Sequence, residues 1–146
     1  MVVLVAAVSL LALLNVFGQW PSTATVAASA ATLEVRSPNA VRGGLLYQSR
    51  FTVRARRDVK DATLVLGRGW LEGLTVNTIE PGPLSEASRD GRLSLELGHV
   101  PAGEKYVLYI QYQVNPTTVG SHTQTVALYD GDEPILTYEK TLRVFP

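Results

Sequence analysis

The chain has 146 residues, and its 13 Lys and Arg balance 13 Asp and Glu to give a formal net charge of +0. This length is enough for one small domain, and the neutral balance removes most of the electrostatic support for nucleic-acid binding. The chain contains no cysteine and 2 histidines. Disulfides, cysteine-ligated zinc, iron–sulfur clusters and thiol nucleophiles are therefore excluded.

The amino-terminal segment is strongly apolar. Residues 1–33 carry no charged side chain, and residues 2–17 are apolar except for Ser9 and Asn15. With Trp20 at a membrane interface, this pattern predicts a single transmembrane anchor over residues 1–20, which places the following domain outside the cytoplasm.

A signal peptide is the alternative, because Ala28-Ser29-Ala30 has the small-x-small form that signal peptidase accepts. That site lies far beyond the end of the apolar run, which favours an anchor or an uncleaved signal. Residues 21–31 are rich in Ser, Thr and Ala, and this composition predicts a flexible linker between the membrane and the domain.

From Thr32 to Pro146 the apolar residues recur with a period of two, which predicts short strands. Between residues 47 and 56 the alternation is clearest, with a core face that includes Phe51 and an opposite polar face. Asp90-Gly91 is a strong signal for a hairpin turn. The predicted strands are residues 32–36, 47–56, 62–66, 74–78, 93–97, 106–114, 122–129 and 135–145.

Seven or eight short strands without a credible helix predict an all-β domain over residues 32–146. The most economical packing is an Ig-like two-sheet antiparallel sandwich, and a closed barrel is the alternative. Because the chain has no cysteine, hydrophobic packing alone must connect the two sheets.

Some turns suggest a family. The segment Val100-Pro101-Ala102-Gly103-Glu104 precedes a long alternating strand, which is followed by Asn115, Gly120 and a last strand that runs to the terminus. This arrangement resembles the Ig-like repeat domains of bacterial surface proteins, including the cell-adhesion-related type. An anchor with one such domain, and 10 Arg against 3 Lys, is also similar to single-pass envelope proteins of high-GC bacteria. The resemblance implies an extracytoplasmic binding or structural module and brings no catalytic residues.

The sequence contains no motif that supports an enzyme activity or a bound cofactor. His99 and His122 have no second potential ligand at short spacing, and no serine lies in a Gly-x-Ser-x-Gly motif. The acidic residues of 130–133 could converge on Ca²⁺, but Asp130-Gly131 is also the pair that a hairpin turn needs.

Four residues are candidates for partner binding. Arg50, Arg54 and Arg56 alternate with core residues, so their guanidinium groups should form a row on the outer face of a sheet. They either pair with acidic neighbours such as Glu34 or Glu96 or meet an anionic partner. Trp70 either caps one end of the sandwich or stands exposed as a contact anchor.

These residues predict a membrane-anchored, non-catalytic module that contacts another envelope protein or an anionic polymer. The alternative is an accessory or sensor subunit of an envelope enzyme or transporter. Such a subunit would bind a small ligand or Ca²⁺ at the loop end near Asp130.

Overall fold

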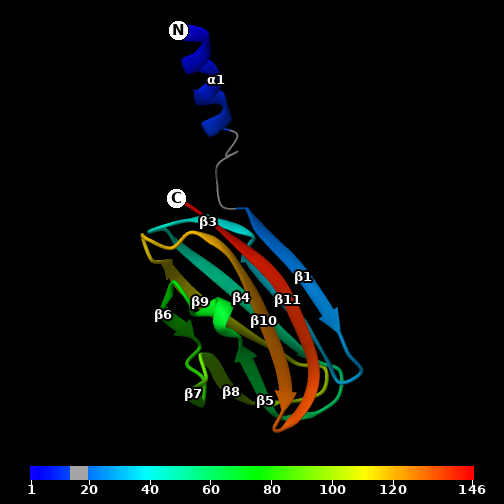
Figure 1. Ribbon diagram of the computed structural model, residues 1–146. Coiled ribbons are helices and arrows are strands. Elements are labelled where there is room, and N and C mark those ends of the chain that lie inside the picture. Colours follow the sequence, from blue (N-terminus) through cyan, green and yellow to red (C-terminus); the bar gives the residue numbers. More distant parts are fainter. Residues whose placement is uncertain (14–19) are drawn as a thin grey trace.

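The computed structural model describes residues 1–13 and 20–146, and it is dominated by β-structure (Figure 1). One α-helix, α1 (Val2–Leu13), precedes the strands, and a short 3₁₀ helix, η1 (Arg68–Trp70), lies between two of them. The strands are β1 (Pro21–Ala27), β2 (Ala31–Pro38), β3 (Ala40–Arg42), β4 (Leu46–Ala55), β5 (Val59–Leu66), β6 (Leu74–Glu80), β7 (Ser85–Arg89), β8 (Arg92–Val100), β9 (Lys105–Val114), β10 (Gly120–Asp130) and β11 (Glu133–Phe145).

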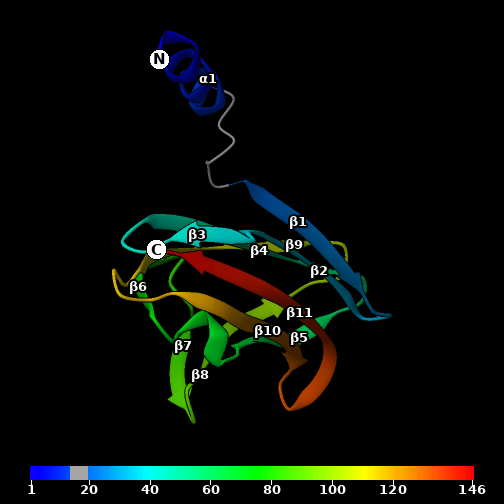
Figure 2. The same ribbon diagram turned by 45° about the horizontal axis from the view of Figure 1, so that its top comes forward.

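The strands form two sheets packed face to face (Figure 2). One sheet has the order β1-β2-β4-β9-β6, and the other has the order β3-β11-β10-β5-β8-β7. The predicted two-sheet sandwich is confirmed, and two separate sheets with open edges rule out the closed barrel. The sandwich is not purely antiparallel, because β3 pairs with β11 in parallel.

The core lies between the sheets and follows the predicted alternation. On β4 the side chains of Tyr47, Ser49, Phe51, Val53 and Ala55 are buried, and the intervening side chains face outward. Successive side chains of a strand point to opposite faces, so one apolar face per strand is enough to fill the space between two sheets.

Residues 21–27, predicted as part of a flexible linker, form strand β1 instead. Each of these residues pairs with a residue of β2, from Pro21 opposite Pro38 to Ala27 opposite Thr32. None of the β1 side chains is buried. The strand is therefore held mainly by its backbone hydrogen bonds, which is why its Ser, Thr and Ala composition gave no apolar signal.

No strand is predicted over the five residues of β7, which are polar except for Ala87. All its residues are exposed, and it pairs with β8 through a two-residue turn at Asp90-Gly91. Asp90 and Gly91 have φ angles of 52° and 74°, the left-handed conformation that Asp-Gly hairpin turns adopt. The predicted turn is confirmed.

At the amino terminus, the helix covers Val2–Leu13 of the anchor predicted over residues 1–20. Residues 14–19 of that anchor lie outside the described residues. Among the described residues, no helix is both long enough and apolar enough to span a bilayer.

The two sheets are joined by aromatic packing around η1. This helix carries the chain from β5 in one sheet to β6 in the other, and it buries Trp70 completely. The Trp70 ring lies 5.2 Å from the Phe51 ring, edge to face, and 6.1 Å from the Tyr112 ring, which it stacks on. Such pairs add to the free energy gained by burying the rings.

Replacing Phe51 with Ala should lower the free energy of unfolding by about 3–5 kcal/mol, because it opens a cavity against Trp70 in a fully buried site. Thr52→Ala is the matched control on the outer face of the same strand, and its effect should stay within about 0.5 kcal/mol. Denaturant unfolding measures both. Equal losses for the two variants would mean that the faces of β4 are assigned wrongly.

Candidate functional site

The outer face of the six-stranded sheet is hollowed along β5 and β8. Two adjoining hollows, of about 450 and 570 Å³, lie there and share the side chains of Val65, Ala87 and Ser94. We call the two together the β5–β8 groove. Its other lining residues are Asp61, Thr63, Arg68, Ser85, Arg89, Asp90, Arg92, Glu96, Tyr129, Gly131 and Asp132.

Small side chains make the floor of the groove. Val65 on β5 lies opposite Ser94 on β8, and Ser94 lies opposite Ala87 on β7. Three short side chains in one cross-strand row leave space above the sheet, and the longer side chains at each end of the groove enclose it.

One end of the groove is acidic. Asp61, Glu96 and Asp132 line it, and no basic residue lines the same hollow. Ser85 donates a hydrogen bond of 2.7 Å to the Glu96 carboxylate, which fixes that side chain. Asp61 Oδ1 is buried and has no hydrogen-bond partner among the described residues. A buried carboxylate oxygen without a donor is costly, so a ligand with a positive group would be favoured here.

The other end is basic. Arg68, Arg89 and Arg92 line it together with a single carboxylate, Asp90. Arg68 Nε donates to the backbone oxygen of Asp90 at 2.9 Å, so this arginine is held over the β7–β8 turn. The two ends are separated by about six residues of β5, which corresponds to about 20 Å in an extended strand.

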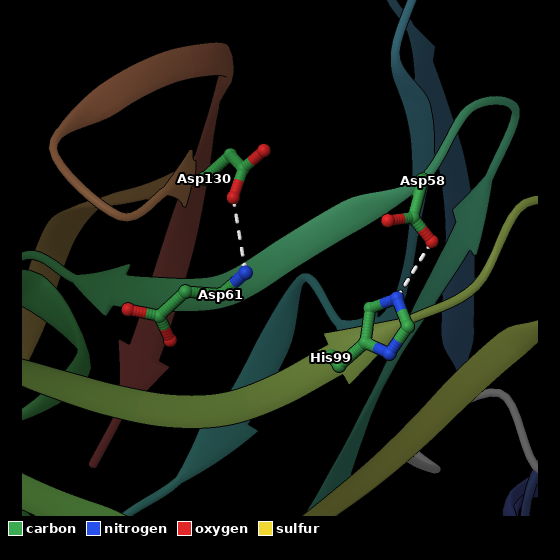
Figure 3. Close-up of polar contacts among 4 residues, drawn as sticks. All are labelled: Asp58, Asp61, His99 and Asp130. Atoms are coloured by element: carbon green, nitrogen blue, oxygen red, sulfur yellow. Dashed lines mark hydrogen bonds and ion pairs between the residues drawn. The ribbon is translucent and has the colours of Figure 1, made fainter.

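The loop near Asp130 is a possible Ca²⁺ site from its sequence. In the structure, Asp130 and Gly131 form hydrogen bonds with the backbone of Asp61 (Figure 3). Asp130 Oδ1 accepts a hydrogen bond of 3.0 Å from the backbone N–H of Asp61, and the N–H of Gly131 donates to the Asp61 carbonyl at 2.8 Å. These bonds lie at an irregularity of β5, where the pairing register with β8 shifts. No three acidic or histidine side chains in residues 1–13 and 20–146 are grouped to hold a metal ion.

His99 makes a polar contact that the sequence did not predict. Its Nε2 lies 2.6 Å from Asp58 Oδ1, and both side chains are about half exposed (Figure 3). The pair joins the end of β8 to the turn before β5 and lies outside the groove lining.

Arg50 and Arg54 of the predicted arginine row lie on the outer face of the five-stranded sheet, opposite to the groove, and Arg56 follows the end of β4. Arg50 Nη2 forms an ion pair of 2.9 Å with Glu34 Oε1 on β2, which is the pairing that the sequence left open. Arg54 lies directly opposite Lys105 of β9. Like charges in this position repel, so the end of the row near Arg56 is the part open to an anionic partner. Partner binding by Arg54 and Arg56 stays a prediction.

Trp70 is fully buried between the sheets and cannot be an exposed contact anchor. The sequence left two possibilities for it, and the buried one is correct. Gly67 and Gly69, on either side of Arg68, allow η1 to approach β10 closely. A Cβ atom on Gly69 would lie 1.9 Å from the Thr123 carbonyl oxygen.

A partly buried lysine lies beside Trp70. Lys140 of β11 donates to the Pro38 carbonyl at 2.7 Å and to the Ser37 carbonyl at 3.4 Å. Its Nζ also lies 6.0 Å from the centre of the Trp70 ring, at the limit of a cation–π contact. Burial lowers the pKa of Lys140 to about 8. Burial also raises the pKa of Tyr112 well above 10.

No local pattern in the sequence predicts the β5–β8 groove as a whole. Asp61 and Asp132 are 71 positions apart in the chain, and only the pairing of β10 with β5 brings them to one end of a hollow. The one signal in the sequence is the local excess of carboxylates in residues 130–133.

Known proteins share this fold. No known protein family and no curated protein matches the sequence. A non-cellulosomal cohesin from Archaeoglobus fulgidus is 18% identical over 86% of this chain and 92% of that one, with a TM-score of 0.50. A chain of the CaDoc0917–CaCohA2 complex is 13% identical over 73% of this chain and 94% of that one, with a TM-score of 0.52. The likeness extends to the fold, an Ig-like β-sandwich.

Lys140 should make the stability of the fold rise with pH between about 8 and 9, below the range near pH 10 in which the tyrosines of the unfolded chain ionise. Lys140 has a lower pKa in the folded state than in the unfolded chain, so the unfolded state binds more protons in this window and loses them as the pH rises. Replacing Lys140 with Met should remove this pH dependence. The difference in the free energy of unfolding between the variant and the parent protein should therefore change as the pH rises above 8. Urea unfolding at pH 7, 8, 9 and 10 measures it, and parallel curves for the two proteins would contradict the assignment.

Proposed function

We propose that this protein is a non-catalytic protein-binding domain whose β5–β8 groove holds an extended segment of a partner. The observation that carries the proposal is the separation of charge along one groove, with three carboxylates at one end and three arginines at the other. The segment that fits has a basic side chain at one end and an acidic side chain about six residues away.

The floor of the β5–β8 groove and the carboxylate of Asp61 are compatible with such a segment. Small side chains at Val65, Ala87 and Ser94 leave room for a backbone in the middle of the groove. The Asp61 carboxylate lines the acidic end and provides a negative charge for a Lys or Arg side chain of the partner. The fold is compatible with this role, since a chain of the CaDoc0917–CaCohA2 complex has the same architecture.

We further propose that the domain works in the cell envelope, outside the cytoplasm, and that α1 holds it at a membrane. Every described residue of α1 is exposed, and the helix is apolar on all sides, with Ser9 as its one polar residue. An apolar helix without a polar face needs an apolar environment to cover it. The partner is then another envelope protein.

The groove is tested with two end-capped ten-residue peptides of the same composition. In one, two Lys and two Glu stand at opposite ends, and in the other they alternate. Because separated charges match both ends of the groove, the first peptide should bind about tenfold more tightly at low salt, and added salt should reduce the difference. Fluorescence anisotropy of labelled peptides measures the affinities.

Arg89→Ser combined with Arg92→Ser should abolish the preference for the first peptide. The matched control is Arg54→Ser with Arg56→Ser on the other sheet, which should retain it. Equal binding of the two peptides to the parent protein would contradict the proposal. If only the control variant with Arg54→Ser and Arg56→Ser loses the preference for the first peptide, the arginine row is the contact surface instead of the groove.

A further inference from the structure

One end of the sandwich carries a group of large apolar side chains on its surface. Leu45, Leu46, Val119 and Phe145 are 42%, 54%, 58% and 50% exposed. Monomeric domains commonly expose such residues singly, but a group of them indicates a contact surface. We call this group the apolar end.

The topology brings these residues together from three parts of the chain. Phe145 at the end of β11 pairs with Arg42 of β3, and Leu45 follows three residues later. Gly120 at the start of β10 pairs with Val144, which places Val119 beside the end of β11. The carboxyl end of β11, the β3–β4 connection and the β9–β10 loop therefore share one end of the molecule.

Basic side chains accompany the apolar ones. Arg42 at the end of β3 and Arg143, two residues before the end of β11, are exposed. One carboxylate, Glu72, is exposed at the same end, in the turn that contacts residues 115–118 through Gly73. An apolar surface with a basic rim is complementary to a bilayer that contains anionic headgroups.

Strand β1, which follows the apolar helix in the sequence, begins at this same end. Strand β1 begins at Pro21, which pairs with Pro38, two residues before β3. In both ribbon views the chain enters β1 on the side of the domain where β3 and the carboxyl terminus lie (Figures 1 and 2).

We infer that the apolar end lies against a lipid bilayer, with Leu46, Val119 and Phe145 at the headgroup boundary and Arg42 and Arg143 on anionic headgroups. This inference rests on the proposed attachment of α1 to a membrane. This contact sets the orientation of the domain relative to the bilayer. Strand β11 then stands away from the bilayer, and the acidic end of the groove near Asp132 points toward the partner side, about 40 Å from the lipid by the length of β11.

The test uses the full chain and the absence of native cysteine. Single cysteines at Leu46→Cys and Val119→Cys carry an environment-sensitive fluorophore, and Ser88→Cys on β7 is the control far from this end. The labelled proteins are floated with phosphatidylcholine vesicles that contain phosphatidylglycerol. Labels at 46 and 119 should brighten several-fold and resist quenching by iodide in the aqueous phase, whereas the label at 88 should stay accessible.

Each other outcome overturns a defined part of the inference. If the protein floats but labels 46 and 119 are quenched as readily as label 88, the apolar end does not contact lipid, although membrane attachment stands. If the protein does not float, both membrane attachment and the apolar-end contact fail, and the peptide-binding groove is unaffected. If labels 46 and 119 are shielded without vesicles in a protein that sediments as a dimer, a second copy covers this end.

Discussion

The two sheets of this chain depend on the packing of Trp70 between Phe51 and Tyr112. Many small Ig-like domains have a disulfide between their sheets, and this chain has no cysteine. The aromatic rings take that place, since Trp70 comes from the crossover η1 and its two partners come from β4 and β9 of the five-stranded sheet. The approach of η1 to β10 requires a glycine at position 69, where any side chain would collide with the backbone of Thr123.

The same crossover shapes the candidate site. Gln124 Nε2 donates to the Gly69 carbonyl at 3.2 Å and Gly67 N–H donates to the Thr125 carbonyl at 2.8 Å, so η1 is fixed against the six-stranded sheet. Arg68 lies between these anchored glycines, and its side chain extends outward to the β7–β8 turn. The core contact of Trp70 and the basic end of the groove are thus built from adjacent residues of one short helix.

The strands with large apolar residues were predictable, because burial of one face imposes the period of two that β4 and β9 show. Strands β1 and β7 were not, since they lie at sheet edges and are held by backbone pairing, to which side chains contribute little. Alternation alone predicts the outer face of β4 for Arg50 and Arg54, and both lie there. The ion pair of Arg50 with Glu34 and the position of Arg54 opposite Lys105 depend on strand register, which short-range patterns do not specify.

The neutral total charge hides a strong separation of charge on the surface. Carboxylates gather at one end of the β5–β8 groove and arginines at the other, while the apolar end carries Arg42 and Arg143. In the proposed orientation the basic rim faces the bilayer and the acidic end of the groove faces away from it. Charge placement, rather than net charge, then decides which surface meets the membrane and which meets the partner.

The most direct measurement is site-specific photocrosslinking of the full chain in its native membrane. A photoreactive residue replaces Ala87 on the groove floor, and the same residue replaces Thr52 on the outer face of the other sheet as the control. The account predicts one discrete crosslinked protein from position 87, with the link in an extended segment whose opposite charges are about six residues apart, and none from position 52. A partner captured from position 52 while position 87 captures none would contradict it.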